Sequence, residues 1–204
     1  MDAAIQAVLD SYEARYAKES QLMRSEPLEK VMARRDEFLL PVGAETGTIL
    51  NLLIKGAKAT SILEIGTSYG YSALYLGEAA RATGGKLTTV ELSPEKSRQA
   101  RAAVESAGLA AQVDFQVGSA LEVLPRLAGP FDFVLIDLWK DLYIPCLDLI
   151  YGKLKAGALV AADNMTYPDS ARADARAYQR RVRELEFDSV LLPVGSGVEL
   201  SRRR

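Results

Sequence analysis

Histidine is absent from this chain of 204 residues, and cysteine occurs once, at Cys146. Without histidine the chain cannot form a Ser-His-Asp or Cys-His hydrolytic centre, a histidine-ligated zinc site or a histidine general base. A single cysteine rules out an intrachain disulfide, which is typical of proteins in a reducing cytoplasm. Cys146 follows Pro145 in an apolar stretch, so burial rather than reactivity is its expected role.

The sequence also lacks long hydrophobic runs and a strong net charge. No run approaches the roughly eighteen uncharged apolar residues that a membrane span needs, and the acidic N-terminus, with Asp2, Asp10 and Glu13, does not resemble a signal segment. The net charge of −2 argues against a nucleic-acid surface. With 49% hydrophobic and 25% charged residues, the composition is that of a globular domain. We therefore expect a cytoplasmic protein without nucleic-acid or membrane partners.

What the sequence does have is a regular alternation of apolar runs and amphipathic stretches. Helical spacing predicts helices at 2–24, after Pro27 and at 43–58. Strands are predicted at 61–65, 86–91, 112–117, 131–137 and 158–163, with helices between them at 71–82, 94–108, 120–127 and about 143–155. A helix at 170–185 precedes strands at 188–192 and 197–201, which a hairpin turn joins. This order predicts a doubly wound, mostly parallel α/β sheet in one domain over 1–204.

Two of the apolar runs end abruptly in polar residues, one at Asp137 and the next at Asp163 and Asn164. In an open α/β sheet the carboxyl ends of the strands border the crevice where ligands bind, so these side chains should meet there. Two carboxylates and an amide oxygen suit Mg²⁺ or another divalent cation. Lys140 follows Asp137 by three positions and is a candidate proton acceptor beside such a cation. The alternative is that these residues only end strands and begin turns, with Lys140 as a solvated surface lysine.

A glycine turn follows the first predicted strand, in the segment from Glu64 to Ser72. Its spacing, Gly66-x-x-x-Gly70, differs from the Gly-x-Gly-x-x-Gly that admits a dinucleotide pyrophosphate. Glu64, taken as part of the turn, would repel phosphate and attract an ammonium or sulfonium group. Ser72, in the first turn of the next helix, could bind a carboxylate. An amino-acid-bearing nucleoside with a positive sulfur therefore fits better than a dinucleotide.

Two further candidates follow neighbouring strands. Glu91 closes the strand at 86–91, where an acid holds ribose hydroxyls in doubly wound folds, although it could equally be a helix N-terminal charge before Pro94. Ser119 follows the strand at 112–117 and could face an adenine edge or act as an ordinary helix N-cap.

Taken together, these motifs resemble the metal-dependent, S-adenosylmethionine-dependent O-methyltransferases, which include catechol O-methyltransferase and the caffeoyl-CoA O-methyltransferases. The resemblance is carried by four segments: Glu64–Ser72, Val90–Glu91, Asp137–Asp141 and Asp163–Asn164. It extends from about Val42 to Arg202, and it implies a catalytic core at 42–202 that follows an N-terminal helical extension at 1–40. It implies a seven-stranded Rossmann-like sheet in the order 3-2-1-4-5-7-6, with an antiparallel last strand.

The resemblance also implies a role for each candidate residue. S-adenosylmethionine would be bound by Val42, Gly43, Glu64, Gly66, Gly70, Ser72, Glu91, Ser119 and Asp137. Within this set, Gly66 and Ser72 would contact the methionine part, Glu91 the ribose and Ser119 the adenine. Mg²⁺ or another divalent cation would be bound by Asp137, Asp163 and Asn164, and Lys140 would be the general base.

The implied acceptor is a small aromatic molecule with adjacent hydroxyls, such as a catechol, a flavonoid or a hydroxycinnamoyl compound. Trp139-Lys140-Asp141 resembles the catechol enzyme, but Leu138 stands where that enzyme has a histidine. Leu191–Val198 resembles the caffeoyl-CoA branch, with Ser196 in place of an aspartate. At Val190–Pro193 the chain lacks the glutamate with which the catechol enzyme contacts the second hydroxyl. The sequence leaves open whether the acceptor is a free molecule or a coenzyme A thioester.

Several features keep alternative interpretations. Trp139, the only tryptophan, could line the site of an aromatic acceptor or serve in packing. Arg172, Arg176 and Arg180 share one helical face, which favours a solvated surface over an anion clamp for a coenzyme A acceptor. The alternative functions are a nicotinamide-dependent oxidoreductase, which the glycine spacing disfavours, and a non-catalytic S-adenosylmethionine-binding regulator, which would need neither the acids nor Lys140. A homodimer is one expected assembly.

Overall fold

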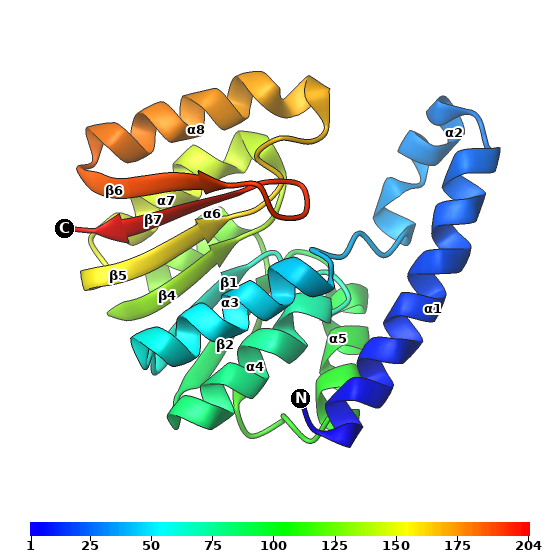
Figure 1. Cartoon of the computed structure of the whole chain (residues 1–204), viewed down its shortest axis with the longest axis horizontal. Coiled ribbons are helices and arrows are strands. Elements are labelled where there is room, and N and C mark those ends of the chain that lie inside the picture. The colour runs from blue at the N-terminus through cyan, green and yellow to red at the C-terminus, as the bar shows by residue number, and fades with distance from the viewer.

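The computed structural model describes the chain from 1 to 204 apart from residues 28, 32 and 35. The N-terminal helices are α1 (Ala3–Ser25), α2 (Leu28–Ala33), a 3₁₀ turn (Arg35–Glu37) and α3 (Ala44–Ala57). Asp2 caps α1, because its carboxylate accepts the N–H of Ile5 at 3.0 Å. The buried side of α1 packs against α4 (Tyr71–Thr83) and α5 (Pro94–Ser106), along one edge of the molecule (Figure 1).

The sheet has seven strands in the order β3-β2-β1-β4-β5-β7-β6. Their bounds are β1 (Ser61–Ile65), β2 (Lys86–Glu91), β3 (Val113–Val117), β4 (Phe131–Ile136), β5 (Leu154–Ala162), β6 (Phe187–Leu192) and β7 (Val198–Arg203). The first five strands pair in parallel, and β7 pairs antiparallel with both β5 and β6. Strands β1 and β4 are buried nearly throughout, which explains their unbroken apolar runs. The predicted fold class and strand order are confirmed.

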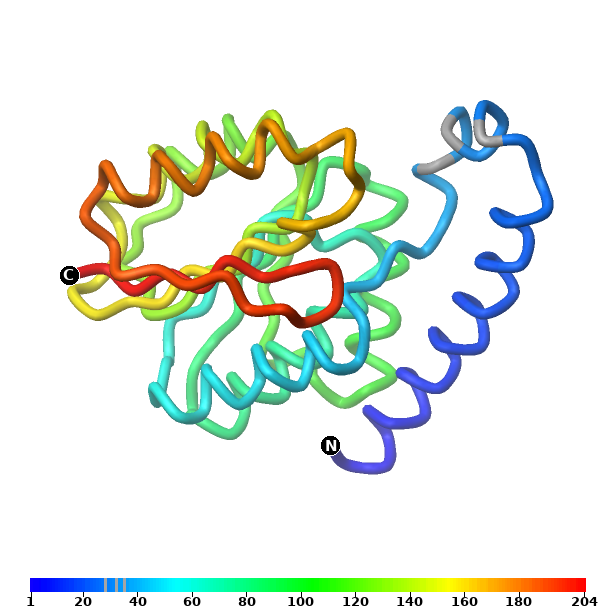
Figure 2. Tube along the Cα trace, turned by 45° about the horizontal axis from the view of Figure 1, so that its top comes forward, coloured from blue at the N-terminus to red at the C-terminus, as the bar shows by residue number. Residues whose placement is uncertain are grey.

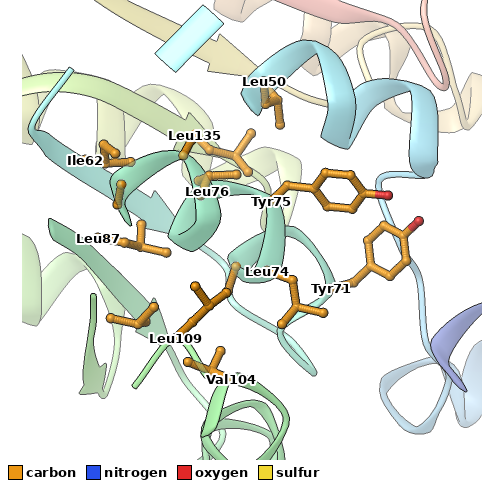
Figure 3. Close-up of a cluster of buried hydrophobic side chains, with 14 of the residues drawn as sticks. Leu50, Ile62, Tyr71, Leu74, Tyr75, Leu76, Leu87, Val104, Leu109 and Leu135 are labelled. Atoms are coloured by element: carbon orange, nitrogen blue, oxygen red, sulfur yellow. The ribbon is translucent and has the colours of Figure 1, made fainter. Parts of the chain in front are cut away.

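Helices cover both faces of this sheet (Figure 1). On one face, α3, α4 and α5 enclose a core cluster in which Leu50, Leu76 and Leu135 lie close together (Figure 3). On the other face, α6 (Ala120–Val123), α7 (Tyr143–Tyr151) and α8 (Arg172–Glu184) enclose a second cluster, which contains the buried Tyr143 and Tyr178. Within the described part of the chain, no helix combines the length and the apolar character that crossing a membrane requires.

The largest difference from the sequence prediction is at β5. The helix expected at 143–155 ends at Tyr151, and the strand begins at Leu154 instead of 158. Gly157 has φ +79°, and the pairing of β4 with β5 shifts register between Phe131 and Phe133. This bulge interrupts the apolar pattern, so only the second half of the strand is visible in the sequence.

The helix expected at 120–127 is also shorter. It ends as α6 at Val123 and tightens into a 3₁₀ turn over Leu124–Arg126. Pro125 lies in that turn, and proline removes a backbone N–H that a continuing α-helix would need.

Candidate active site

The carboxyl ends of three neighbouring strands bring the predicted polar residues together. The N–H of Asp137 donates to the carbonyl of Ile65 at 2.9 Å, and the N–H of Asp163 donates to the carbonyl of Ile136 at 3.1 Å. Both acids therefore extend the pairing of β1, β4 and β5 by one more hydrogen bond. The site lies at the edge of the sheet where an open α/β fold binds its ligands.

Asp137 and Asp163 form a pair of like charges in this crevice. Asp163 is 1% exposed, and its Oδ1 has no hydrogen-bond partner among the described residues. Burial raises the pKa of Asp163 to about 6. Burial and the charge of Asp163 together raise the pKa of Asp137 well above its usual value. A buried carboxylate oxygen without a partner costs free energy that a bound cation would offset, so the pair fits a divalent metal ion.

Asn164 directly follows this pair and has φ +54°, a left-handed conformation that asparagine tolerates. The next two N–H groups, of Met165 and Thr166, donate to the loop between β6 and β7, to Gly197 at 2.9 Å and Ser196 at 2.8 Å. The residues that the structure describes hold no group of three or more His, Cys, Asp or Glu that could bind a metal. A cation here would thus rely on two carboxylates, the amide oxygen of Asn164 and solvent, which is a hard oxygen set.

Lys140 reaches the same place from the 3₁₀ turn Lys140–Leu142. Its Nζ donates to the backbone carbonyl of Asp163 at 2.7 Å and lies 3.7 Å from the centre of the Tyr143 ring. Burial lowers the pKa of Lys140 to about 8, although the charges of Asp137 and Asp163 act in the opposite direction. The structure thus brings Lys140 beside the acid pair.

Gly66 and Gly70 are required by the path of the glycine turn. Gly66 has φ +105°, and a Cβ there would lie 1.9 Å from the carbonyl oxygen of Asp137. Gly70 has φ +91°, and a Cβ there would lie 2.9 Å from the Cβ of Ala100 in α5. The sequence suggested that these glycines let a ligand approach. In the structure they also let the end of β4 and the side of α5 approach.

Glu64 is not part of the turn, so this sequence prediction is wrong. It lies within β1, is fully buried, and accepts a hydrogen bond from Thr89 Oγ1 at 2.5 Å. Burial raises the pKa of Glu64 to about 7, and the hydroxyls of Ser72 and Thr89 offset part of that rise. Its partners, Thr89 in β2 and Ser72 in α4, place the Glu64 carboxyl on the face of the sheet that α4 covers.

The carboxylate of Glu91 connects two turns at the end of β2. Its Oε2 accepts the N–H of Ser68 at 2.7 Å, and its Oε1 accepts the N–H of Ser93 at 2.9 Å. Glu91 therefore supports both the glycine turn and the start of α5, and each oxygen keeps a lone pair for a ligand. Ser119 stands at the N-cap position of α6 but makes no side-chain capping bond, so capping does not occupy its hydroxyl.

A small cavity lies where residues 39–42 meet the glycine turn. Its walls are residues 39–42, 66–69, 71–72 and 137, and it encloses about 10 Å³, room for about one water molecule. Four of the predicted cofactor residues line it, namely Val42, Gly66, Ser72 and Asp137. The other five do not, namely Gly43, Glu64, Gly70, Glu91 and Ser119. A nucleoside cofactor needs more room than this conformation encloses.

Sequence reasoning missed the side chains that hold residues 36–42 against the glycine turn. The Tyr69 hydroxyl donates to the Glu37 carbonyl at 3.2 Å, and the guanidinium carbon of Arg15 lies 4.0 Å from the centre of the Tyr69 ring. The N–H of Leu39 donates to the Glu19 carboxylate at 2.5 Å. Figure 2 shows this segment leading back to the start of α3, beside the body of the molecule. These partners lie at least 20 residues apart, so no local motif could have indicated them.

Large apolar side chains are exposed in three segments of this region. Leu40 in the cavity wall is 51% exposed, Trp139 beside Lys140 is 43% exposed, and Tyr167 in the segment after Asn164 is 67% exposed. They provide apolar surface of the kind that an aromatic acceptor needs.

The two remaining sequence interpretations concern side chains outside the crevice. Cys146 is fully buried, and burial raises its pKa to about 12, which confirms a packing role. Arg172, Arg176 and Arg180 are exposed along α8, and Arg172 pairs with Asp169 at 2.8 Å. The solvated face is therefore the interpretation that the structure favours.

Solved methyltransferase structures share this architecture. An O-methyltransferase from Bacillus cereus, in complex with SAH, superposes with a TM-score of 0.76 at 25% identity, covering 95% of this chain and 100% of that one. Cofactor-bound Rv0187 from MTB superposes with a TM-score of 0.80 at 28% identity, covering 100% of this chain and 91% of that one. The fold is thus that of Rossmann-like methyltransferase structures.

The sequence comparisons identify the family. A family model described as O-methyltransferase matches residues 13–204, and the chain belongs to that family. Caffeoyl-CoA O-methyltransferase 2 of Eucalyptus globulus is 33% identical over 224 residues, covering 99% of this chain and 89% of the relative. Caffeoyl-CoA O-methyltransferase of Petroselinum crispum is 32% identical over 224 residues, with coverage of 99% and 91%. Membership of this family identifies the protein as an enzyme that transfers methyl groups. It excludes the alternatives of a nicotinamide-dependent oxidoreductase and of a non-catalytic regulator.

Proposed function

We propose that this O-methyltransferase transfers the methyl group of S-adenosylmethionine to one hydroxyl of an aromatic vicinal diol, with the help of a divalent cation. The choice of methyl donor is supported by two neighbours, the Bacillus cereus enzyme in complex with SAH and TomG of Streptomyces achromogenes in complex with SAM. The choice of acceptor is supported by the relatives named for caffeoyl-CoA, since a caffeoyl group carries two adjacent hydroxyls.

The proposed cofactor site extends from the glycine turn to the N-terminus of α3. Gly43 precedes this helix with φ +85°, and a Cβ there would meet nothing within 4 Å, so the helix N-terminus is open to a carboxylate. Glu91 has lone pairs left for two ribose hydroxyls, and Ser119 has an uncommitted hydroxyl for the adenine side. When bound, S-adenosylmethionine supplies the electrophilic methyl group.

The metal site rests on one observation, the unpartnered and buried Oδ1 of Asp163 beside a second carboxyl, Asp137. A protein gains nothing in stability from burying two acids with one lysine, whereas a cation would give both carboxylates a partner. Asp137, Asp163 and Asn164 would hold this cation. When bound, it supplies positive charge that lowers the pKa of an acceptor phenol from about 10 toward neutrality.

The side chains of this enzyme would then perform the remaining tasks. Lys140, held by the carbonyl of Asp163, would accept the phenolic proton at Nζ. Trp139 and Leu40 would contact the aromatic ring and keep water from the reacting oxygen. Methyl transfer by in-line displacement then needs only that the donor and acceptor be aligned.

Methyl-transfer assays with and without Mg²⁺ test this proposal. Acceptors should include a catechol, the matching monophenol and a hydroxycinnamoyl thioester with adjacent hydroxyls. We expect activity with the diols, little with the monophenol, and loss of activity in excess chelator. The variant Asp163→Ala should lose methyl transfer but still bind S-adenosylhomocysteine. Its control is Asp169→Ala, which removes an exposed acid that pairs with Arg172.

Two results would contradict the proposal. Full activity in excess chelator would remove the metal from the reaction, and equal rates for the monophenol and the catechol would remove chelation as the activating device. The relative rates of the free catechol and the thioester would identify the acceptor class. A homodimer and a cytoplasmic location stay predictions.

A further inference from the structure

Tyr143 shares an acceptor with the candidate base. It begins α7 three residues after Lys140, so both side chains project from one helical turn. Its hydroxyl donates to the backbone carbonyl of Asp163 at 3.0 Å, and Lys140 Nζ donates to the same oxygen at 2.7 Å. A carbonyl oxygen has two lone pairs, so these two donors satisfy it completely.

This shared carbonyl connects Lys140 with the turn that carries Asp163 and Asn164. The Asp163–Asn164 turn is held on one side by Tyr143 and Lys140, and on the other by the Met165 N–H, which donates to Gly197 at 2.9 Å. Lys140 is in turn fixed from two directions, by the carbonyl and by the face of the Tyr143 ring at 3.7 Å. The carboxylate and the amide that would bind the cation therefore share one rigid frame with the ammonium group.

We propose that Tyr143 is a positioning residue of the reaction. Its hydroxyl fixes the backbone from which Asp163 and Asn164 project and, through the shared carbonyl, the position of Lys140. At 1% exposure Tyr143 reaches neither solvent nor acceptor, so it acts only through these neighbours. The inference rests on the proposed metal-dependent function, and it assigns to the hydroxyl a task that a phenylalanine could not perform.

Tyr178 of α8 offers a matched control. It is as deeply buried as Tyr143, and the two rings meet edge to face, with centroids 5.7 Å apart at 81°. The Tyr178 hydroxyl, however, has no hydrogen-bond partner within the described residues. Replacing either tyrosine by phenylalanine removes one buried hydroxyl, but only Tyr143→Phe removes a hydrogen bond to the site.

The test compares Mn²⁺ binding, S-adenosylhomocysteine binding and turnover in the wild type, Tyr143→Phe and Tyr178→Phe. For Tyr143→Phe we expect Mn²⁺ affinity to fall about 10- to 100-fold, the usual effect of losing a group that orients metal ligands. We also expect a lower kcat at saturating Mn²⁺. S-adenosylhomocysteine affinity should stay unchanged, because that ligand would rest on the glycine turn, the ends of β2 and β3 and the start of α3, whereas the Tyr143 hydroxyl donates to Asp163. For Tyr178→Phe all three quantities should stay at the wild-type values.

The outcomes separate this inference from the function on which it rests. If the wild type binds Mn²⁺ and Tyr143→Phe binds it equally well, Tyr143 has no positioning role and the metal site stands. If Tyr143→Phe loses S-adenosylhomocysteine affinity in proportion to Mn²⁺ affinity, or cannot be obtained folded while Tyr178→Phe can, its role is general packing and the inference is overturned. If the wild type binds no Mn²⁺, the proposed metal site is wrong and the role of Tyr143 is lost with it.

Discussion

Replacing Gly66 by alanine should damage both the stability and the site, because of what lies next to its Cα. The added Cβ would lie 1.9 Å from the carbonyl oxygen of Asp137, and φ at this position is +105°. An L-residue held at such a φ costs about 1–2 kcal/mol. The contact can be relieved by moving the peptide between Asp137 and Leu138, and this movement would disturb the N–H of Asp137, which donates to Ile65 at 2.9 Å. Losing that buried hydrogen bond costs about 1–3 kcal/mol more.

Gly108→Ala separates the two contributions. Gly108 also has a positive φ, +69°, but a Cβ there would meet nothing within 4 Å. This control should lose only the conformational contribution, about 1–2 kcal/mol, whereas Gly66→Ala should lose about 2–5 kcal/mol. Urea unfolding of the two variants measures the difference directly. Mn²⁺ titration should also show weaker binding only in Gly66→Ala, since Asp137 moves with its peptide.

Equal free energies of unfolding for Gly66→Ala and Gly108→Ala would refute this reasoning. They would mean that the end of β4 yields to the added methyl group without cost. In that case the glycine would be explained by its backbone conformation alone.

Three further predictions follow from single side chains. Asp132 accepts the N–H groups of Thr60 and Ser61 at 2.9 Å each and pairs with Lys155 at 2.5 Å, so Asp132→Ala should lower the free energy of unfolding by about 1–3 kcal/mol. Burial raises the pKa of Asp132, but these partners outweigh that effect and lower the pKa below its usual value. The wild type should therefore be more stable than Asp132→Ala above about pH 5, and the difference should disappear as the acid is protonated at lower pH. Urea unfolding at several pH values measures this difference. Lys140→Ala should leave S-adenosylhomocysteine binding intact and reduce turnover about 10²- to 10⁴-fold. Part of the loss should be recovered at higher pH, because phenolate formed in solution no longer needs the base. An unchanged rate would remove Lys140 from the mechanism. Asp163→Asn should raise the free energy of unfolding of the metal-free protein by about 1–3 kcal/mol, because it removes one of two buried like charges. The same variant should no longer be stabilised by Mn²⁺. A less stable metal-free variant would show that the acid pair is not repulsive.

The sheet could be predicted well from the sequence because the apolar pattern of each strand and the glycine, proline and serine residues that bound it agree. Lys86–Glu91 has the predicted bounds to the residue, and it is bounded by Gly85 and by the Ser93-Pro94 helix start. Strand β5 was half missed because Gly157 at φ +79° breaks the pattern inside a continuous strand. Pattern-based reasoning reads local periodicity, so it succeeds where each strand is regular and fails at a bulge.

The residues of the candidate site could likewise be predicted where a local sequence pattern marks them, and not where they depend on tertiary packing. Asp137, Asp163 and Lys140 could be found because the chemistry of strand ends is written locally in the sequence. Glu64 was misplaced even though the predicted strand at 61–65 already contained it, because a charged residue next to a glycine turn suggests exposure. The contact of Arg15 with Tyr69 and the bond from Tyr143 to Asp163 depend on tertiary packing, and neither could be predicted from spacing.

The acid pair shows how this fold can hold a site that opposes its own stability. Burying Asp137 and Asp163 together is unfavourable in the protein alone, because each carboxylate loses water and meets a like charge. The cost can be borne because both acids lie at the ends of strands whose other residues are packed in the two cores. Their backbones are fixed by sheet hydrogen bonds, to Ile65 and Ile136, so repulsion cannot move the carboxyls far apart. A site of this kind can relax only by taking up protons or a cation. In the proposed function a cation would take this place, and the rigid strand ends would hold the carboxylates ready for it before the acceptor binds.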